Sequence, residues 1–446
     1  MQDILIKNGE ILTFDEKQTV INKGYVYLRD GKILSVGRGS DLLKVKPAPG
    51  VKTIDARGRV VMPGIINTHM HFYSTFARGM GLPGFSPKKF SEILKGLWWK
   101  LDKQLTLEDI YYSTIVVLID AVKKGVTSII DHHASPYSVE NSLDLIETAF
   151  IQAGVRSSLC YEVSDRDGMD IRDLGMEENI RYLKKVKKAK DPMRSALFGL
   201  HASFTLSDAS LKKAKELSKG LDTGFHIHTA EGIEDYLWAR KHGYKGVVHR
   251  LDKFGILTDK TILVHCIHIS DKEMDIIKKR NSIAVHNPSS NMNNAVGVAK
   301  LLKMINKGVL TGIGTDGMWV DPTREYVNAF LLQRITEGKP TVAFMESFKA
   351  FTNNAEIFNR VSGNNTGRLK KGCAGDLIIK DYIPPTPIAA DNLIGHFLFG
   401  ITNSQTSTTI CNGKILMEDY KLKLKLDPEE IYRKSNELAK NLWKRI

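Results

Sequence analysis

Histidine and aspartate residues that end short apolar runs are the side chains of this sequence best suited to chemistry. His69 and His71 lie two residues apart in IINTHMHF. Residues two apart on a strand point to the same face, so the two imidazoles could share one metal ion, although an H-x-H pair alone is equally compatible with ordinary polar residues. His228 ends the run FHIHT, shares its face with His226, and is followed three residues later by Glu231. A histidine ligand with a carboxylate beside it supplies a metal bond and a proton carrier.

Three further apolar runs end in the same residue types. His265 ends TILVHC, His286 ends SIAVHN and Asp316 ends TGIGTDG. Asp-Gly pairs are common in turns, so this aspartate alone is weak evidence. The ordered set of runs that end in histidine or aspartate indicates a metal-dependent hydrolase whose ion lies near the ends of strands.

The elements that would position these residues alternate between strands and helices from about residue 65 to 360. Helical stretches separate apolar, strand-like runs at 127–131, 224–230, 261–266, 282–287 and 311–316. Such alternation predicts a parallel sheet with crossover helices. If His69 and Asp316 mark the first and eighth strands, the 247 residues between them make seven units of about 35 residues, close to the average of an eight-fold barrel. The predicted fold class is therefore α/β, a (β/α)8 TIM-like barrel with its active site at the carboxyl ends of the strands.

Short strand-like runs at both ends of the chain predict a second, smaller domain. Asn-Gly and Asp-Gly pairs that favour tight turns separate these runs near the start, and another pair, Asn412-Gly413, stands near the end. Asp427 before Pro428 predicts the start of a terminal amphipathic helix. We predict a β-sandwich at residues 1–62 and 366–426, a barrel at 63–365 and a helix at 427–446.

The composition argues against several classes of protein. Of the 446 residues 42% are hydrophobic, yet no run of 18 or more apolar residues occurs, so no membrane partner is expected. The net charge of +14 is spread out, without a nucleic-acid-binding motif, and its densest cluster, at 184–190, fits a solvated helix face. The first residues do not resemble a secretory signal and the four cysteines lie far apart. We therefore expect free thiols, a cytoplasmic protein and no nucleic-acid partner.

Together these motifs resemble the amidohydrolase superfamily, and within it the aminohydrolase branch that includes chlorohydrolases, guanine deaminase and adenosyl-homocysteine deaminases. The stretch DHHASP (131–136) is most similar to the aminohydrolases called SsnA, which are associated with purine breakdown. The resemblance covers nearly the whole chain through PGIINTHMH (63–71), HASFTLS (201–207), HIHTAEG (226–232), LVHC (263–266), HNPSSN (286–291), GTDG (314–317), PPTPI (384–388) and DNLIGHFLFG (391–400).

The resemblance implies a role for each matching residue. Glu231 would hand protons to the substrate, and His265 would orient or deprotonate a water held by the metal. Asp316 would pass that water's proton to departing ammonia. A set of three imidazoles and a carboxylate leaves an open position for this water, as catalytic metal sites require. The implied ligands of one divalent ion are His69, His71, His228 and Asp316.

The stretch that matches the fourth strand of the family indicates the number of metal ions and a possible substrate contact. Two-metal relatives carry a carbamylated lysine there, and SALFGLHASF (195–204) has no lysine, which favours one ion. Zinc suits the ligand set, and iron and manganese stay open. His201 would face the substrate, and His132 and His133 are further candidate substrate contacts; each of the three could instead be structural.

The predicted function is deamination of a purine-like or other nitrogen heterocycle, a hydrolysis of a non-peptide carbon–nitrogen bond that fits purine catabolism. One alternative is hydrolysis of a cyclic amide or a carbon–halogen bond on the same site. Another is a non-catalytic relative that keeps the barrel for oligomeric interaction, and the complete ligand set argues against it. Homodimers are common among relatives.

Overall fold

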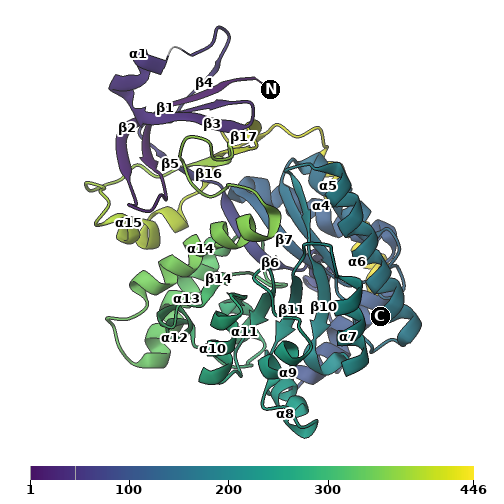
Figure 1. The fold of residues 1–446 in the computed structure, drawn as a ribbon. Coiled ribbons are helices and arrows are strands. Elements are labelled where there is room, and N and C mark those ends of the chain that lie inside the picture. The colour runs from purple at the N-terminus through teal and green to yellow at the C-terminus, as the bar shows by residue number, and fades with distance from the viewer. Residues whose placement is uncertain (1, 46) are drawn as a thin grey trace.

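Parallel strands form the barrel of this chain, which the computed structural model describes over residues 2–45 and 47–446 (Figure 1). One parallel sheet contains β6 (Ile65–Met70), β7 (Val126–His133), β8 (Arg156–Tyr161) and β9 (Arg194–Ala196). The other contains β10 (Phe198–Ala202), β11 (Phe225–Thr229), β12 (Ile262–His265), β13 (Ile283–His286) and β14 (Leu310–Ile313). Single parallel bridges join the sheets at both edges, between Met70 and Asp316 and between Val163 and Leu200. Because only Leu197 separates β9 from β10, these two share the fourth strand position, and the predicted barrel fold is confirmed.

Helices follow the strands and cover the outside of the barrel (Figure 1). Local sequence fixes their ends, as α4 (Leu107–Lys124) shows. Thr106 and Asp109 form a capping box at its start, and Gly125, at φ 80°, ends it directly before β7. The others are α5 (Ser142–Ala153), α6 (Met169–Ala189), α7 (Asp208–Leu217), α8 (Ile233–Lys241), α9 (Val247–Lys253), α10 (Asp271–Lys279), α11 (Pro288–Asn293), α12 (Leu301–Asn306), α13 (Pro322–Glu337) and α14 (Phe344–Ser362).

Both chain ends contribute to the additional domain, which was expected as a sandwich and is hydrogen-bonded as one nine-stranded sheet. The antiparallel pair of β5 and β15 joins the two chain ends. The Asp30-Gly31 and Asn412-Gly413 turns have positive φ at both residues, as tight hairpins require. The strands are β1 (Ile4–Leu12), β2 (Val20–Arg29), β3 (Lys32–Arg38), β4 (Lys52–Asp55), β5 (Val60–Pro63), β15 (Leu377–Lys380), β16 (Thr406–Cys411), β17 (Lys414–Glu418) and β18 (Lys421–Leu422).

A buried ion pair connects this sheet to the barrel. Arg156, which begins β8, is 1% exposed and binds both carboxylate oxygens of Asp376 at 2.7 and 3.1 Å. It also donates to the side chain of Asn412 at 2.9 Å and to the carbonyl oxygen of Pro192 at 2.9 Å. The charge is therefore paired and its donors are used, which is the condition under which burial of an arginine is tolerated.

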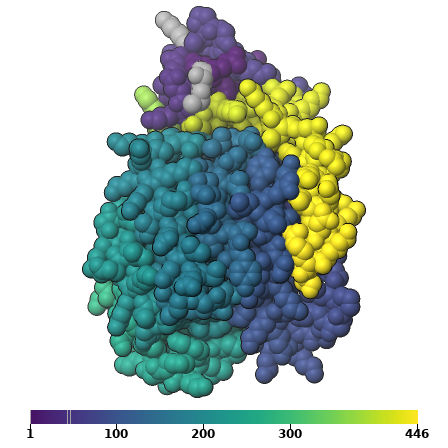
Figure 2. Space-filling model, turned by 90° about the vertical axis from the view of Figure 1, so that its right-hand side faces the viewer, coloured from purple at the N-terminus to yellow at the C-terminus, as the bar shows by residue number. Residues whose placement is uncertain are grey.

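The C-terminal helix α16 (Pro428–Trp443) packs against α4, on the side of the barrel that Figure 2 shows in yellow over blue. Asp427 caps it and Pro428 takes its first position, as the sequence predicted. Trp443 donates from Nε1 to the carbonyl oxygen of Phe76 at 2.6 Å. Within residues 2–45 and 47–446, no helix is both long and apolar enough to cross a membrane.

Short helical turns between β6 and α4 cover the open end of the barrel. They are η2 (Phe72–Ala77), α2 (Phe90–Ile93), η3 (Leu94–Trp98), α3 (Trp99–Leu101) and η4 (Asp102–Gln104). Their apolar side chains face the cavity at this end, so they form one wall of the site described next.

Candidate metal centre and substrate pocket

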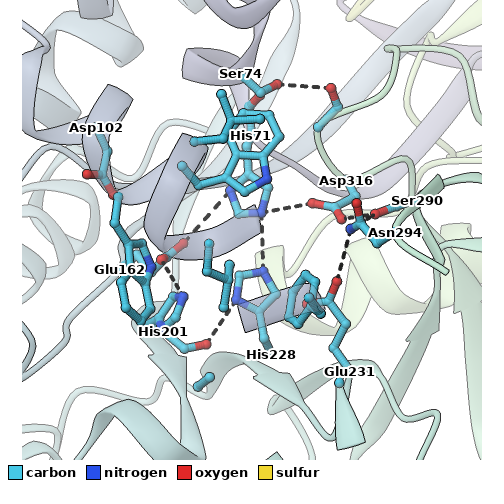
Figure 3. Close-up of a pocket in the computed structure, with 18 of the residues that line it drawn as sticks. His71, Ser74, Asp102, Glu162, His201, His228, Glu231, Ser290, Asn294 and Asp316 are labelled. Carbon is cyan, nitrogen blue, oxygen red and sulfur yellow. Dashed lines mark hydrogen bonds and ion pairs between the residues drawn. The ribbon is translucent and has the colours of Figure 1, made fainter. Parts of the chain in front are cut away.

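Four histidines and an aspartate from the ends of β6, β11, β12 and β14 come together at the carboxyl end of the barrel; Figure 3 shows His71, His228 and Asp316 among them. The backbone brings Asp316 to β6, because Asp316 N–H donates to the carbonyl oxygen of His69 at 3.1 Å. Its Oδ1 lies 3.6 Å from Nε2 of His69 and 3.1 Å from Nε2 of His71. Nε2 of His71 is 3.2 Å from Nε2 of His228. The four residues predicted as metal ligands are thus neighbours in space.

These spacings fit a divalent metal ion. Two ligand atoms on one tetrahedral zinc are about 3.4 Å apart, given bonds of about 2.1 Å. His69, His228, His265 and Asp316 each offer an atom within 4.8 Å of the others. Nε2 of His69 and of His265 are buried and have no hydrogen-bond partner among the described residues. Lone pairs that converge without a protein donor are what a cation site needs.

Hydrogen bonds behind the cluster fix the orientation of its imidazoles. Nδ1 of His71 donates to the carbonyl oxygen of His132 at 2.5 Å, and Nδ1 of His228 donates to that of His201 at 3.0 Å. Nδ1 of His69 is paired with Nε2 of His226 at 2.9 Å. With each Nδ1 engaged, each Nε2 points into the cluster, which is the usual arrangement of metal-binding histidines.

The residues predicted as catalytic lie on the other side of the cluster. Nε2 of His265 is 3.4 Å from Oε2 of Glu231 and 3.9 Å from Oδ2 of Asp316. Asn294 donates to Oε1 of Glu231 at 3.4 Å, and Ser290 donates to Oδ2 of Asp316 at 2.5 Å. All three acid–base groups can therefore exchange protons with a molecule bound between them.

Burial shifts the pKa of the carboxyl groups around the cluster. It raises the pKa of Glu231 well above its ordinary value, and the charge of Asp316 adds to the shift. Burial also raises the pKa of Glu162 to about 7. For Asp316 burial acts in the same direction, but the imidazoles of His69 and His71, 3.6 and 3.1 Å away, outweigh it and hold the pKa well below its usual range. Glu231 is thereby suited to hold a proton at neutral pH, and Asp316 to stay ionised.

A cavity of about 380 Å³ opens onto this cluster. Its apolar wall comes from the turns after β6 and includes Phe90, Leu97 and Trp98. His201 lines the cavity, as expected for a substrate contact. The structure places His132 and His133, at 0% and 1% exposure, behind the cavity wall and outside its lining.

Several polar groups of the site were not identified from the sequence. Glu162 and Asp102 line the cavity, and neither ends a run in the pattern used to find the ligands. Ser290 and Asn291 belong to the quoted stretch HNPSSN, but only their position on α11 reveals what they bind: Asp316 and, at 2.8 Å, Nδ1 of His265. For Glu162, the available signal was its position directly after the strand-like run at 156–161.

Comparison with known proteins agrees with this arrangement. The model of the amidohydrolase family matches residues 60–416. The chain is 31% identical to a 5′-deoxyadenosine deaminase of Methanosarcina mazei over 452 aligned positions, which cover 100% of both chains. It is 30% identical to a 5-methylthioadenosine/S-adenosylhomocysteine deaminase of Thermococcus sibiricus over 93% of this chain and 94% of the other.

Solved structures show the same fold. An adenosine deaminase from Xanthomonas campestris with bound zinc superposes with a TM-score of 0.88 at 20% identity, covering 100% of this chain and 99% of the other. A zinc-bound atrazine chlorohydrolase from Arthrobacter aurescens TC1 reaches 0.81 at 18% identity, covering 98% and 100%. Both are similar to this chain over its barrel and its additional domain.

Proposed function

Because the chain belongs to the amidohydrolase family, we propose that it deaminates an adenosine derivative altered at the 5′ position. It is a hydrolase of carbon–nitrogen bonds, as its deaminase relatives indicate. The observation that carries the proposal is the convergence of the four predicted metal ligands beside one cavity, whose lining includes His71, His228, Asp316 and Glu231. The names of the relatives supply the substrate class.

We propose one zinc ion as the cofactor, held by His69, His71, His228 and Asp316. When bound, such an ion lowers the pKa of water to about 7 and so makes hydroxide available at neutral pH. The support is the ligand spacing described above and the absence of a lysine from the fourth strand position. Iron or manganese would satisfy the same donors.

The protein's own groups would move the protons. The carboxyl of Glu231, whose pKa is raised by burial, can donate to the ring nitrogen beside the reacting carbon. His265 faces both Glu231 and Asp316, so it can orient the nucleophile and take up its proton. Asp316, whose Oδ2 accepts from Ser290, can pass a proton to the leaving ammonia.

The charge of the cavity narrows the substrate class. Among the residues that the structure describes, its lining contains one arginine, Arg78, and no lysine. The apolar wall suits a flat heterocycle, and the acidic lining disfavours a phosphate on the sugar. We therefore propose a free nucleoside rather than a nucleotide. The carboxylates that line the cavity are Asp102, Glu162, Glu231, Asp235 and Asp316.

Ammonia release from a panel of substrates tests the proposal. The zinc-loaded protein should release ammonia from 5′-deoxyadenosine or 5′-methylthioadenosine, and at least tenfold less efficiently, by kcat/KM, from adenosine 5′-phosphate. An aminotriazine, a chlorotriazine and a cyclic amide serve as the comparison set. Ring opening or chloride release without any ammonia from a nucleoside would refute the deaminase proposal and support the alternative hydrolysis.

We also propose a cytoplasmic homodimer. Four buried free thiols are consistent with a reducing compartment. Leu331 and Ile335 on α13, 53% and 82% exposed, and Phe399 at the end of α15 (Leu393–Phe399), 70% exposed, offer an apolar surface for a second copy. Sedimentation of the protein as a monomer at micromolar concentration would contradict the dimer.

A further inference from the structure

Glu162 is a carboxylate of the cavity that the proposed mechanism does not use. It directly follows β8, is 7% exposed and lines the cavity on the side away from Glu231 (Figure 3). Its Oε1 lies 3.4 Å from Nε2 of His201, and its Oε2 lies 3.6 Å from Nδ1 of His132. Oε2 is buried and without a hydrogen-bond partner among the described residues. A buried carboxylate oxygen without a hydrogen-bond partner lowers the stability of the fold. A ligand that donates to this carboxylate would remove that cost.

The carboxylate of Glu162 favours a proton on one of the two nitrogens of His201. Nδ1 lies 2.7 Å from the hydroxyl oxygen of Thr205, which also lies 3.1 Å from the carbonyl oxygen of Ala202 and can donate to either atom. Nε2 faces the carboxylate of Glu162, where a proton is electrostatically favoured. At 3.4 Å these two atoms are too far apart for a strong hydrogen bond with each other. The wall of the cavity thus presents a donor, Nε2–H of His201, next to an acceptor, Oε1 of Glu162.

His132 lies beside the other carboxylate oxygen, Oε2. Its ring is fully buried, stacks on His226 with centroids 4.5 Å apart at 7°, and has no partner on either nitrogen within the described chain. Nδ1 of His71 is also near Oε2 of Glu162, at 3.9 Å, but its proton is given to the carbonyl oxygen of His132. Nδ1 of His132, 3.6 Å away, is therefore the unpaired nitrogen that faces Oε2, too far for a hydrogen bond but near enough for an electrostatic contact, while Oε1 faces His201.

We propose that Glu162 is a substrate-recognition residue that, with His201, binds a two-atom polar edge of the heterocycle: a ring nitrogen beside an N–H or O–H group. Nε2–H of His201 donates to the ring nitrogen, and Oε1 of Glu162 accepts from the neighbouring group. In an adenosine, nitrogen 7 stands beside the 6-amino group and nitrogen 3 beside the sugar. The inference rests on the proposed function.

A cation between the same side chains is the competing interpretation. Glu162, His201 and His228 also offer atoms within 4.8 Å of one another. Nε2 of His228, however, lies 3.2 Å from Nε2 of His71 in the first cluster, and one lone pair serves one ion. A second ion would keep two protein ligands, fewer than stable metal sites use. The geometry therefore favours a substrate edge.

Steady-state kinetics of the zinc-loaded full chain on an adenosine substrate and its 3-deaza and 7-deaza analogues test the inference. The wild type should prefer the parent over one analogue by roughly ten- to a hundredfold in kcat/KM, the strength of a hydrogen bond to a charged or polarised group. Glu162→Gln should raise KM more than it lowers kcat, reduce that preference at least threefold, and leave the metal content and the melting temperature no lower. Asp102→Asn, which removes another carboxylate of the cavity, is the matched control and should keep the preference.

Each other result has a defined meaning. An unchanged preference in Glu162→Gln overturns the inference, as does a wild type that accepts both deaza analogues as well as the parent, a result that needs no variant to fold. A second equivalent of metal that Glu162→Gln loses overturns it in favour of a cation site. No ammonia from any nucleoside refutes the proposed function itself, and the inference falls with it.

Discussion

The barrel mouth and the junction between barrel and sheet both bury charged or polar groups. The two regions differ in whether these groups have hydrogen-bond partners. At the junction Arg156 meets Asp376, Asn412 and Pro192 with its donors used. At the mouth Nε2 of His69, Nε2 of His265 and Oε2 of Glu162 have no partner among the described residues. Since an unsatisfied buried polar group costs about 1–3 kcal/mol, the mouth lowers the stability of the empty protein and is suited to a ligand. The junction instead holds the two parts together.

Metal removal should show the largest difference between the two regions, because it should affect the barrel mouth and leave the junction intact. Chelation is expected to abolish ammonia release, because the nucleophile loses its activating cation, and the junction should stay folded. Activity and elemental analysis before and after chelation measure this, with readdition of zinc as the control. A chelated, metal-free protein that kept full activity would contradict the proposed centre.

Glu231→Gln tests proton transfer at the barrel mouth without removing a proposed metal ligand. We expect kcat to fall by about 10²–10⁴-fold, the contribution of a general acid, while the metal content stays at the wild-type level. Asn294→Ala is the control, because it removes a neutral donor that lies 3.4 Å from Oε1 of Glu231 and 3.4 Å from Oγ of Ser290, and it should cost far less. Equal losses in both variants would show that the carboxyl does not transfer the proton.

Asp376→Asn tests the junction. Breaking a buried ion pair leaves the guanidinium of Arg156 uncompensated, so we expect the free energy of unfolding to fall by about 3–5 kcal/mol. The folded fraction should keep its kcat, because the pair lies away from the cavity. Urea unfolding measures the loss, and the double variant Arg156→Met, Asp376→Leu should recover most of it. If Asp376→Asn were as stable as the wild type, the junction would not depend on this pair.

Lys380 provides a smaller test within the sheet. It is 4% exposed, and burial lowers its pKa from 10.5 to about 8, against a weaker opposing effect of Asp321. Below pH 8 both folded and unfolded chains are protonated and the folded state carries the full cost of the buried charge; this cost disappears as the pH rises from 8 to 10.5. Lys380→Met should therefore stabilise the protein at pH 7 by about 1–3 kcal/mol, with no gain at pH 10.5. Equal gains at both pH values would assign the effect to packing alone.

The sequence identifies residues at the ends of strands more reliably than it identifies contacts between side chains of different strands. His69, His228 and Asp316 could be found because each ends an apolar run in a repeating order, and the repeat itself predicts the barrel. Glu162 and His132 could not be assigned in this way, since their roles depend on the distance between side chains of different strands. The sheet of the additional domain illustrates the same limit: its turns follow from Asn-Gly and Asp-Gly pairs, but the pairing of β5 with β15 joins residues more than 300 positions apart.

The C-terminal helix has a practical consequence for handling the protein. Trp443 is hydrogen-bonded to η2, the turn that directly follows His71, and Arg445 donates to the carbonyl oxygen of Gln104 beside the cavity wall. An affinity tag appended after Ile446 would disturb the segment that directly follows the first proposed metal ligands, His69 and His71. A tag ahead of β1 would be attached to the additional domain (Figure 1) and not to the turns that form the cavity wall, and is the better choice for purification and immobilisation.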